Sequence, residues 1–199
     1  EADITLTTYA LLRLDADVLT RIDDVLGDAL DTNCRRVIAA VCDGDPGPLF
    51  EIVRDAEAHE FARSDACEAV AMLVLRGEIE KPVAERFLRD AFTQIEPQGE
   101  SFVWWGWQTS IAALGLTDLR FLVAQVFAQG FISRHLMSFS EFEEDLRYAI
   151  EHPSEPWTSG GNPQAFTLFG STVEELADWE NIDPVAEAPR VIELIGRLQ

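Results

Sequence analysis

Two carboxylates one helical turn apart are the residues of this sequence best placed for acid–base chemistry. They are Asp65 and Glu68, in the segment "RSDACE" that begins at Arg63. Side chains three residues apart on a helix share a face, so both could reach one substrate if a pocket surrounds them. The same pair could instead form an ion pair with a neighbouring helix or cap the helix start. The sequence favours the structural role and leaves the acid–base role open.

His59 and Cys67 are of the types that form a nucleophile and its base, but their spacing excludes a dyad. Eight residues of helix separate the two side chains by about 12 Å, well beyond hydrogen-bond reach. The other histidines, His135 and His152, have no neighbours at metal-ligand spacing. We therefore predict no catalytic residue, no metal site and no cofactor.

The segment "CDGDPG" places Asp43 and Asp45 around a glycine, as at the start of a calcium loop. A calcium loop closes with a glutamate at its twelfth position, where this chain has Arg54. We expect the two aspartates to form a turn, where they accept loop amides and cap the following helix.

Three of the five tryptophans fall within the segment "SFVWWGWQTSIAALG", residues 101–115. On a helix Trp104 and Trp107 share the apolar face, which predicts that both are core residues. Trp105 points elsewhere, beside Gln108. It is expected to be the least buried of the three, either packed against a neighbouring element or available to a partner.

The charge balance excludes some partners. Lys and Arg number 15 against 36 Asp and Glu, a formal net charge of −21. Nucleic acids and anionic membranes need a basic surface, so neither is expected as a partner. A basic or neutral protein segment suits this surface, although acidity alone also keeps a protein soluble. Three cysteines without a C-x-x-C pair, and no apolar stretch or leader, predict a cytoplasmic protein. Its single lysine, Lys81, is typical of a GC-rich bacterial genome.

Apolar residues recur at helical spacing along almost the whole chain, and no strand is predicted. The expected helices form pairs, of which the first members lie near 17–27, 47–57, 82–96 and 118–129, and the partners near 31–43, 61–76 and 102–114. Three partners end at a glycine, Gly44, Gly77 and Gly115, which are 33 and 38 residues apart. This period predicts an all-α, HEAT-like α-solenoid of paired antiparallel helices.

The composition of the sequence changes after residue 151, where prolines and glycines are concentrated in the segment "HPSEPWTSGGNPQ". We predict a helical repeat domain at residues 1–151. Residues 152–199 should form a loop and two short helices, the first capped by Ser171. This extension should either pack back on the repeats or bind another chain.

The segments "RRVIAAVCDGDPGPLFEIV", "EFARSDACEAVAMLVLRGEI" and "SFVWWGW" resemble a bacterial domain of unknown function, DUF family 1186, from about Asp28 to Ile150. The resemblance implies an all-helical, HEAT-like fold, and no catalytic residues. Some relatives end in a cysteine-rich zinc motif of the SecA type. The printed sequence ends in "ELIGRLQ", so we expect no zinc-dependent docking from it.

The sequence therefore favours a non-enzymatic protein-binding or scaffold module over an enzyme. The candidate binding residues are Trp105, Gln108, Asp65 and Glu68. The alternative is a hydrolase-type enzyme that uses carboxylates such as Asp65 and Glu68 in a groove between repeats.

Overall fold

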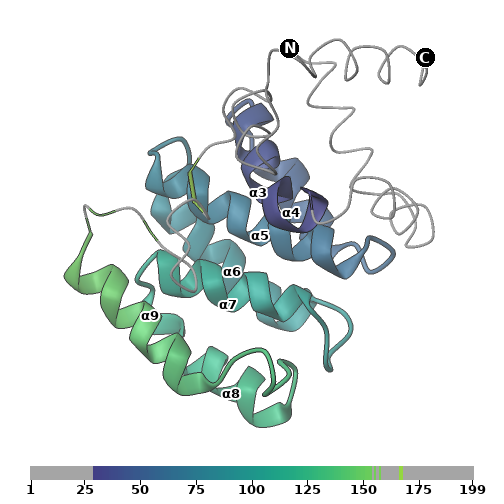
Figure 1. Ribbon diagram of the computed structural model, residues 1–199. Helices are drawn as coiled ribbons and strands as arrows, with labels where there is room; N and C mark the ends of the chain where they lie inside the picture. The colour runs from purple at the N-terminus through teal and green to yellow at the C-terminus, as the bar shows by residue number, and fades with distance from the viewer. Residues whose placement is uncertain (1–28, 154, 156, 158–165, 168–199) are drawn as a thin grey trace, which may run out of the picture. The chain divides into compact units, whose positions relative to one another are not determined.

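The computed structural model describes residues 29–153, 155, 157, 166 and 167 (Figure 1). These residues form α-helices and one short 3₁₀ turn, with no strand among them, so the all-α prediction is confirmed. The elements are α3 (Ala29–Val41), α4 (Gly47–Arg54), α5 (Glu60–Leu75), α6 (Lys81–Gln94), α7 (Val103–Ala113), η1 (Thr117–Leu119), α8 (Arg120–Gln129) and α9 (Phe139–Glu151).

The chain divides into two compact units, residues 1–167 and 168–199, and every described residue belongs to the first. The helix expected near 17–27 and the helices expected after Ser171 lie outside the described residues. The domain boundary expected at residue 151 stays a prediction for the same reason.

Two of the predicted glycine stops end their helices by the same hydrogen-bond pattern. At the end of α5, the amide of Gly77 donates to the carbonyl of Val74 at 2.9 Å, and the amide of Glu78 donates to that of Leu73 at 2.9 Å. Gly115 repeats this arrangement after α7, and the φ angles of Gly77 and Gly115 are +76° and +61°. Glycine adopts this left-handed conformation without the steric cost that other residues incur.

Helix α9 begins at a capping box that the sequence analysis did not single out. The Ser138 hydroxyl accepts from the amide of Glu141, and the Glu141 carboxylate accepts from the amide of Ser138 at 2.7 Å. Both amides lack a partner within the helix, so each side chain satisfies one of them. The acidic segment "EFEEDL", Glu141 to Leu146, lies in the first half of α9.

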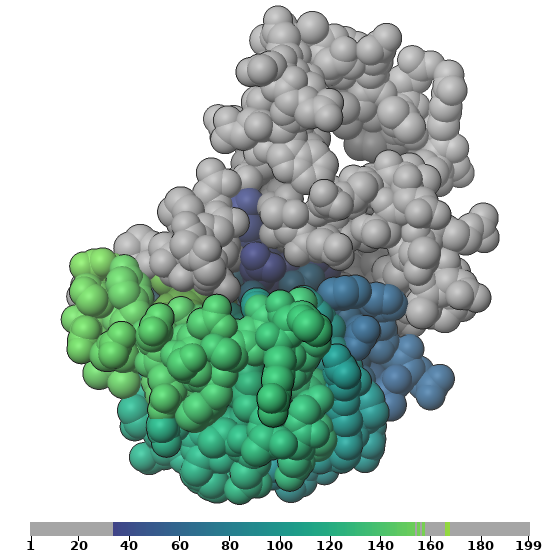
Figure 2. Space-filling model, turned by 60° about the horizontal axis from the view of Figure 1, so that its bottom comes forward, coloured from purple at the N-terminus to yellow at the C-terminus, as the bar shows by residue number. Residues whose placement is uncertain are grey.

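Most of the main contacts join alternate helices of the chain. Helix α5 packs against α3, α4 and α7, and α7 in turn packs against α9. Figure 1 shows α5 in the middle of the described helices, with α3 and α4 on one side and α6 to α9 on the other. In the space-filling view, α8 and α9 form a continuous green surface (Figure 2). Helices α5 and α7 are thus covered by neighbouring helices.

Helices α5 and α7 run parallel and lie very close together. Phe61 contacts Phe102 near the start of both helices, and Ser64 faces Gly106 one turn later. A Cβ atom on Gly106 would lie only 2.2 Å from the carbonyl oxygen of Ser64. The two helices are therefore in register, with residues about 42 positions apart beside one another. Gly106 is the residue that permits the close approach.

The tryptophans occupy the predicted environments. The side chains of Trp104 and Trp107 are both 0% exposed, whereas Trp105 is only partly buried. The indole N–H of Trp107 donates to the Leu88 carbonyl at 2.8 Å, and that of Trp104 donates to the Pro97 carbonyl at 3.2 Å. Both core indoles thus bury their rings and still satisfy their single donor.

The described part of the C-terminal extension packs back on the helices of the first unit. The ring of Trp157 contacts Tyr148 of α9 with 6.5 Å between ring centroids. The guanidinium of Arg36 in α3 donates to the carbonyl of Thr167 at 2.8 Å. These contacts favour the first of the two roles expected for the extension, up to residue 167.

Candidate binding site

Helices α5 and α7 carry seven of the buried polar side chains among the described residues. They are Arg63, Ser64, Asp65, Glu68, Gln108, Thr109 and Ser110. Buried polar groups are costly unless they are hydrogen-bonded or paired, so the partners of each one decide what these two helices can do.

Asp65 and Glu68 are brought together by an arginine from the neighbouring helix. Arg35 of α3 lies 3.6 Å from a carboxylate oxygen of Asp65 and 3.2 Å from one of Glu68. Burial raises the pKa of Glu68 to about 7, and the nearby Arg35 charge opposes this rise. An ion pair between helices, the structural role that the sequence favoured, is thus present.

Gln108 makes different contacts. Its amide nitrogen donates to the Thr109 hydroxyl at 2.8 Å and to the Met137 sulfur at 3.3 Å. Its side-chain oxygen has no partner among the described residues. Gln108, Asp65 and Glu68 are all buried, so Trp105 is the one predicted site residue of the four with appreciable exposure.

Arg63 is a buried cation whose role the sequence analysis did not recognise. Its Nε donates to the carbonyl of Val53 at 3.0 Å, near the end of α4, and an Nη donates to that of Glu96 at 2.6 Å, just after α6. Carbonyls near helix ends lack intrahelical partners, and Arg63 satisfies two of them from the start of α5. Its position in "ARSDACEA" gave no signal, because the partners are distant in sequence.

The structure confirms that His59 and Cys67 do not form a catalytic dyad. His59 caps α5, and its Nδ1 accepts from the amide of Phe61 at 3.3 Å. Burial strongly raises the pKa of the Cys67 thiol, which therefore stays protonated and poorly nucleophilic.

The aspartates of "CDGDPG" form a turn, as expected. Asp43 accepts from the amide of Asp45 at 3.1 Å, and Asp45 accepts from the amide of Gly47, the first residue of α4, at 2.9 Å. Among the described residues, no group of three or more His, Cys, Asp or Glu could hold a metal ion.

Four aromatic side chains form a partly exposed row across the starts of α5 and α7, here called the aromatic row: His59, Phe61, Phe102 and Trp105. Successive ring centroids are 5.3, 4.3 and 5.9 Å apart. Phe61 is 38% exposed, and the other three are partly buried. Trp105 was the one member that the sequence analysis proposed as a binding residue. An alignment of "EFARSD" with "SFVWWG" could have found Phe61 and Phe102, because each phenylalanine is the second residue of its segment.

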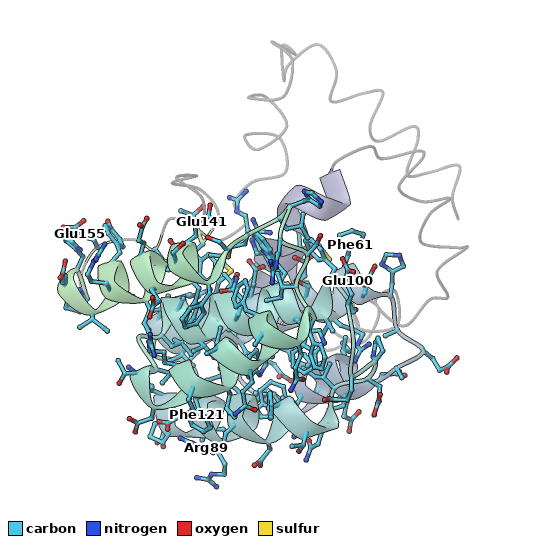
Figure 3. The ribbon with its side chains drawn as sticks, turned by 90° about the horizontal axis from the view of Figure 1, so that it is seen from below. Phe61, Arg89, Glu100, Phe121, Glu141 and Glu155 are labelled. Atoms are coloured by element: carbon cyan, nitrogen blue, oxygen red, sulfur yellow. The ribbon has the colours of Figure 1, made fainter. Side chains whose placement is uncertain are left out.

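Acidic side chains flank the aromatic row. One carboxylate oxygen of Glu60 accepts from the Ser101 hydroxyl and from the Phe102 amide, both at 2.7 Å, which ties the starts of α5 and α7 together. Glu100 is exposed one residue before Ser101. Figure 3 shows Phe61 and Glu100 on the same side of the molecule, away from Phe121. The row therefore combines flat apolar surfaces with negative charge.

None of the described helices is both long enough and apolar enough to cross a membrane.

These features define an acidic protein whose described residues form helices packed around a shared core. The family model for "Protein of unknown function (DUF1186)" matches residues 7–182, and the chain belongs to this family. The resemblance in the segments around residues 35–53, 60–79 and 101–107 is thereby confirmed.

Two curated relatives come from Chlamydia, and both are described as uncharacterized proteins. The chain is 23% identical over 155 residues to a protein of Chlamydia muridarum, and equally to one of Chlamydia trachomatis serovar D. The match covers 78% of this chain and 60% of each relative. No solved structure matches the chain.

Proposed function

We propose that this chain is a HEAT-like helical-repeat module that binds a segment of another protein. The packing of alternate helices, α3 with α5, α5 with α7 and α7 with α9, and the parallel register of α5 and α7 support this architecture. In a solenoid each repeat contacts only its neighbours, so equivalent positions of successive repeats line up along one surface. Such a surface suits an extended partner better than a small substrate.

The aromatic row is the observation that carries this proposal. It lies where α5 and α7 begin, and its large rings are partly exposed. Exposed aromatic groups are the side chains that most often anchor protein interfaces. Trp105 is the proposed anchor, and the net charge of −21 favours a basic or neutral partner over nucleic acid or membrane. A cytoplasmic location in a bacterium is part of the proposal.

Partner capture from the source organism tests the proposal. The unaltered protein should retain a specific protein at about 0.1 M salt and lose most of it at about 1 M, since the Debye length falls from about 10 Å to about 3 Å. Trp105→Ala should reduce capture at low salt. The matched control is Phe121→Ala, which removes an exposed phenyl ring (54% exposed) at a different place. A captured protein indifferent to salt and to Trp105→Ala would remove the case for this surface.

One observation favours the alternative of an enzyme. The pKa of Glu68, raised to about 7 by burial, would suit a general acid. Its side chain is only 3% exposed, so a substrate would have to displace covering groups. Hydrolysis of p-nitrophenyl acetate, phosphate and glycoside probes, abolished by Glu68→Gln in a folded protein, would establish the enzyme and displace the binding module.

A further inference from the structure

The rings of the aromatic row are partly exposed beside the exposed carboxylates of Glu60 and Glu100. The ring planes of Phe102 and Trp105 are nearly parallel, with 11° between them, and the Phe61 ring is tilted against the Phe102 ring. Glu60 uses one of its two oxygens to hold Ser101 and Phe102. Its second oxygen has no hydrogen-bond partner among the described residues, and Glu100 nearby is exposed. A cation over these rings would meet both a π-face and a charged acceptor.

At two other places in the described part of the chain an arginine lies over an aromatic ring. The guanidinium of Arg120 lies 5.2 Å from the centre of the Phe139 ring and also pairs with the carboxylate of Glu143. The guanidinium of Arg54 lies 5.1 Å from the Phe87 ring and donates to the neutral amide oxygen of Gln94 at 2.6 Å. In the part of the chain that the structure describes, no arginine or lysine lies over the rings of the aromatic row. The row therefore has the ring and the carboxylate of the Arg120 site without its cation.

We propose that the aromatic row binds an arginine side chain presented by a partner protein, with Glu60 and Glu100 accepting its hydrogen bonds. This inference rests on the proposed function and specifies the chemistry of the partner. Arginine suits the site better than lysine, because the planar guanidinium stacks on flat rings while its N–H groups reach carboxylates in the ring plane. It suits the site better than an apolar side chain, because the flanking carboxylates would then lose solvent without gaining a partner.

Titration with three matched peptides tests this proposal. Each is a capped glycine–serine peptide that carries three arginines, three lysines or three citrullines. Citrulline keeps the planar shape of arginine and removes its charge. The arginine peptide should shift the indole N–H signal of Trp105 in a ¹H–¹⁵N spectrum and leave those of the buried Trp104 and Trp107 in place. The citrulline peptide should bind at least about tenfold more weakly, and the lysine peptide several-fold more weakly.

Single-residue variants distinguish binding at the aromatic row from non-specific attraction of a cationic peptide to an acidic protein. Phe61→Ala and Trp105→Ala should each lower the affinity for the arginine peptide about five- to tenfold, as measured by calorimetry. Phe121→Ala should leave this affinity unchanged. Glu100→Gln should weaken binding more than Glu144→Gln, which removes one exposed charge from α9. Circular dichroism should show that each variant keeps its helix content.

The inference fails if arginine, lysine and citrulline peptides bind equally, or if Phe121→Ala weakens binding as much as Trp105→Ala. It also fails if no Trp105 signal moves at millimolar arginine peptide. These outcomes are distinct from failure of the proposed function. A partner protein captured through Trp105 by a segment without arginine would keep the binding module and overturn the arginine site.

Discussion

Single buried side chains link separate helices in this protein. Arg63 reaches the carbonyls of Val53 and Glu96, and Trp107 reaches that of Leu88 in the middle of α6. Each of these side chains is almost completely buried and also fills core volume. Truncation of Trp107 should therefore remove packing, and truncation of Arg63 should also leave carbonyl oxygens near helix ends without their donor.

We expect Trp107→Ala to lower the free energy of unfolding by about 3–5 kcal/mol, the range for a large aromatic residue lost from a core. Urea denaturation followed by circular dichroism measures this loss. Trp105→Ala is the matched control and should cost distinctly less, because Trp105 is only partly buried. An unchanged unfolding midpoint for Trp107→Ala would show that Trp107 is not part of the core.

We expect Arg63→Ala to cost about 2–5 kcal/mol, because the Val53 and Glu96 carbonyls lose their donor and a cavity opens beneath α5. The comparison is Arg89→Ala, which removes an exposed arginine paired with Glu85 at 2.9 Å. Surface pairs of this kind contribute less than about 1 kcal/mol. Equal losses of stability in the two variants, measured by urea denaturation, would contradict the structural role of Arg63.

At the scale of elements, the contact of α5 with α7 organises the molecule. Phe61 and Phe102 begin the contact, and Gly106 lets the helix backbones meet at Ser64. Helices α3 and α4 then cover α5, and α9 covers α7. The aromatic row depends on this register, since a shift by one residue would rotate Phe102 and Trp105 away from Phe61.

Gly106→Ala should destabilise the protein by at least about 2 kcal/mol, because the added methyl would lie 2.2 Å from the Ser64 carbonyl oxygen, which is rigid backbone. Gly99→Ala is the control. A Cβ at Gly99 meets no atom within 4 Å, so this variant should unfold within about 0.5 kcal/mol of the unaltered protein. Thermal and urea unfolding measure both effects. If Gly106→Ala leaves the free energy of unfolding unchanged, the backbones of α5 and α7 do not approach each other closely at Gly106.

At the scale of the whole molecule, acidity and burial act together on stability. The chain carries a formal net charge of −21, and among the residues that the structure describes the carboxyl groups of Glu68 and Asp145 have clearly raised pKa values. Burial raises the pKa of Glu68 to about 7. Burial, with the nearby charges of Glu141 and Glu144, raises the pKa of Asp145 to about 6. Both groups bind protons more tightly in the folded state than in the unfolded chain.

Stability should therefore fall as pH rises. For Glu68 the ordinary pKa is 4.5 and the folded value is about 7, so its contribution is fully present below pH 4.5 and is lost as pH rises through 7. Between pH 5 and pH 8 the free energy of unfolding should drop by roughly 1–3 kcal/mol from this group. Glu68→Gln should flatten the pH dependence of the free energy of unfolding, and Glu151→Gln, which removes an exposed charge at the end of α9, should largely preserve it, as measured by urea denaturation at each pH. If the free energy of unfolding of Glu68→Gln depends on pH as steeply as that of the unaltered protein, the dependence arises from other groups.

Much of the element pattern could be predicted from the sequence, because it depends on local chemistry. Apolar spacing predicted the helices that the structure places at 47–54, 60–75, 81–94, 103–113 and 120–129, with errors at their ends. Two further kinds of feature were predictable because their contacts join residues only a few positions apart. They are the helix ends at Gly77 and Gly115 and the turn at Asp43 and Asp45. Helical periodicity likewise separated the buried Trp104 and Trp107 from Trp105.

The partners of the polar residues were decided only by the tertiary structure. Nothing near Arg63 in the sequence indicates that it holds Val53 and Glu96, and nothing near Glu68 indicates Arg35, because these contacts join separate helices. The aromatic row has the same origin: Phe61 and Phe102 are 41 residues apart and meet only because Gly106 lets α5 and α7 pack closely. The sequence by itself determined which segments are helical and which faces are apolar, because both follow from spacing along the chain. Which side chains meet, and which rings stay exposed, was determined by the packing of whole helices.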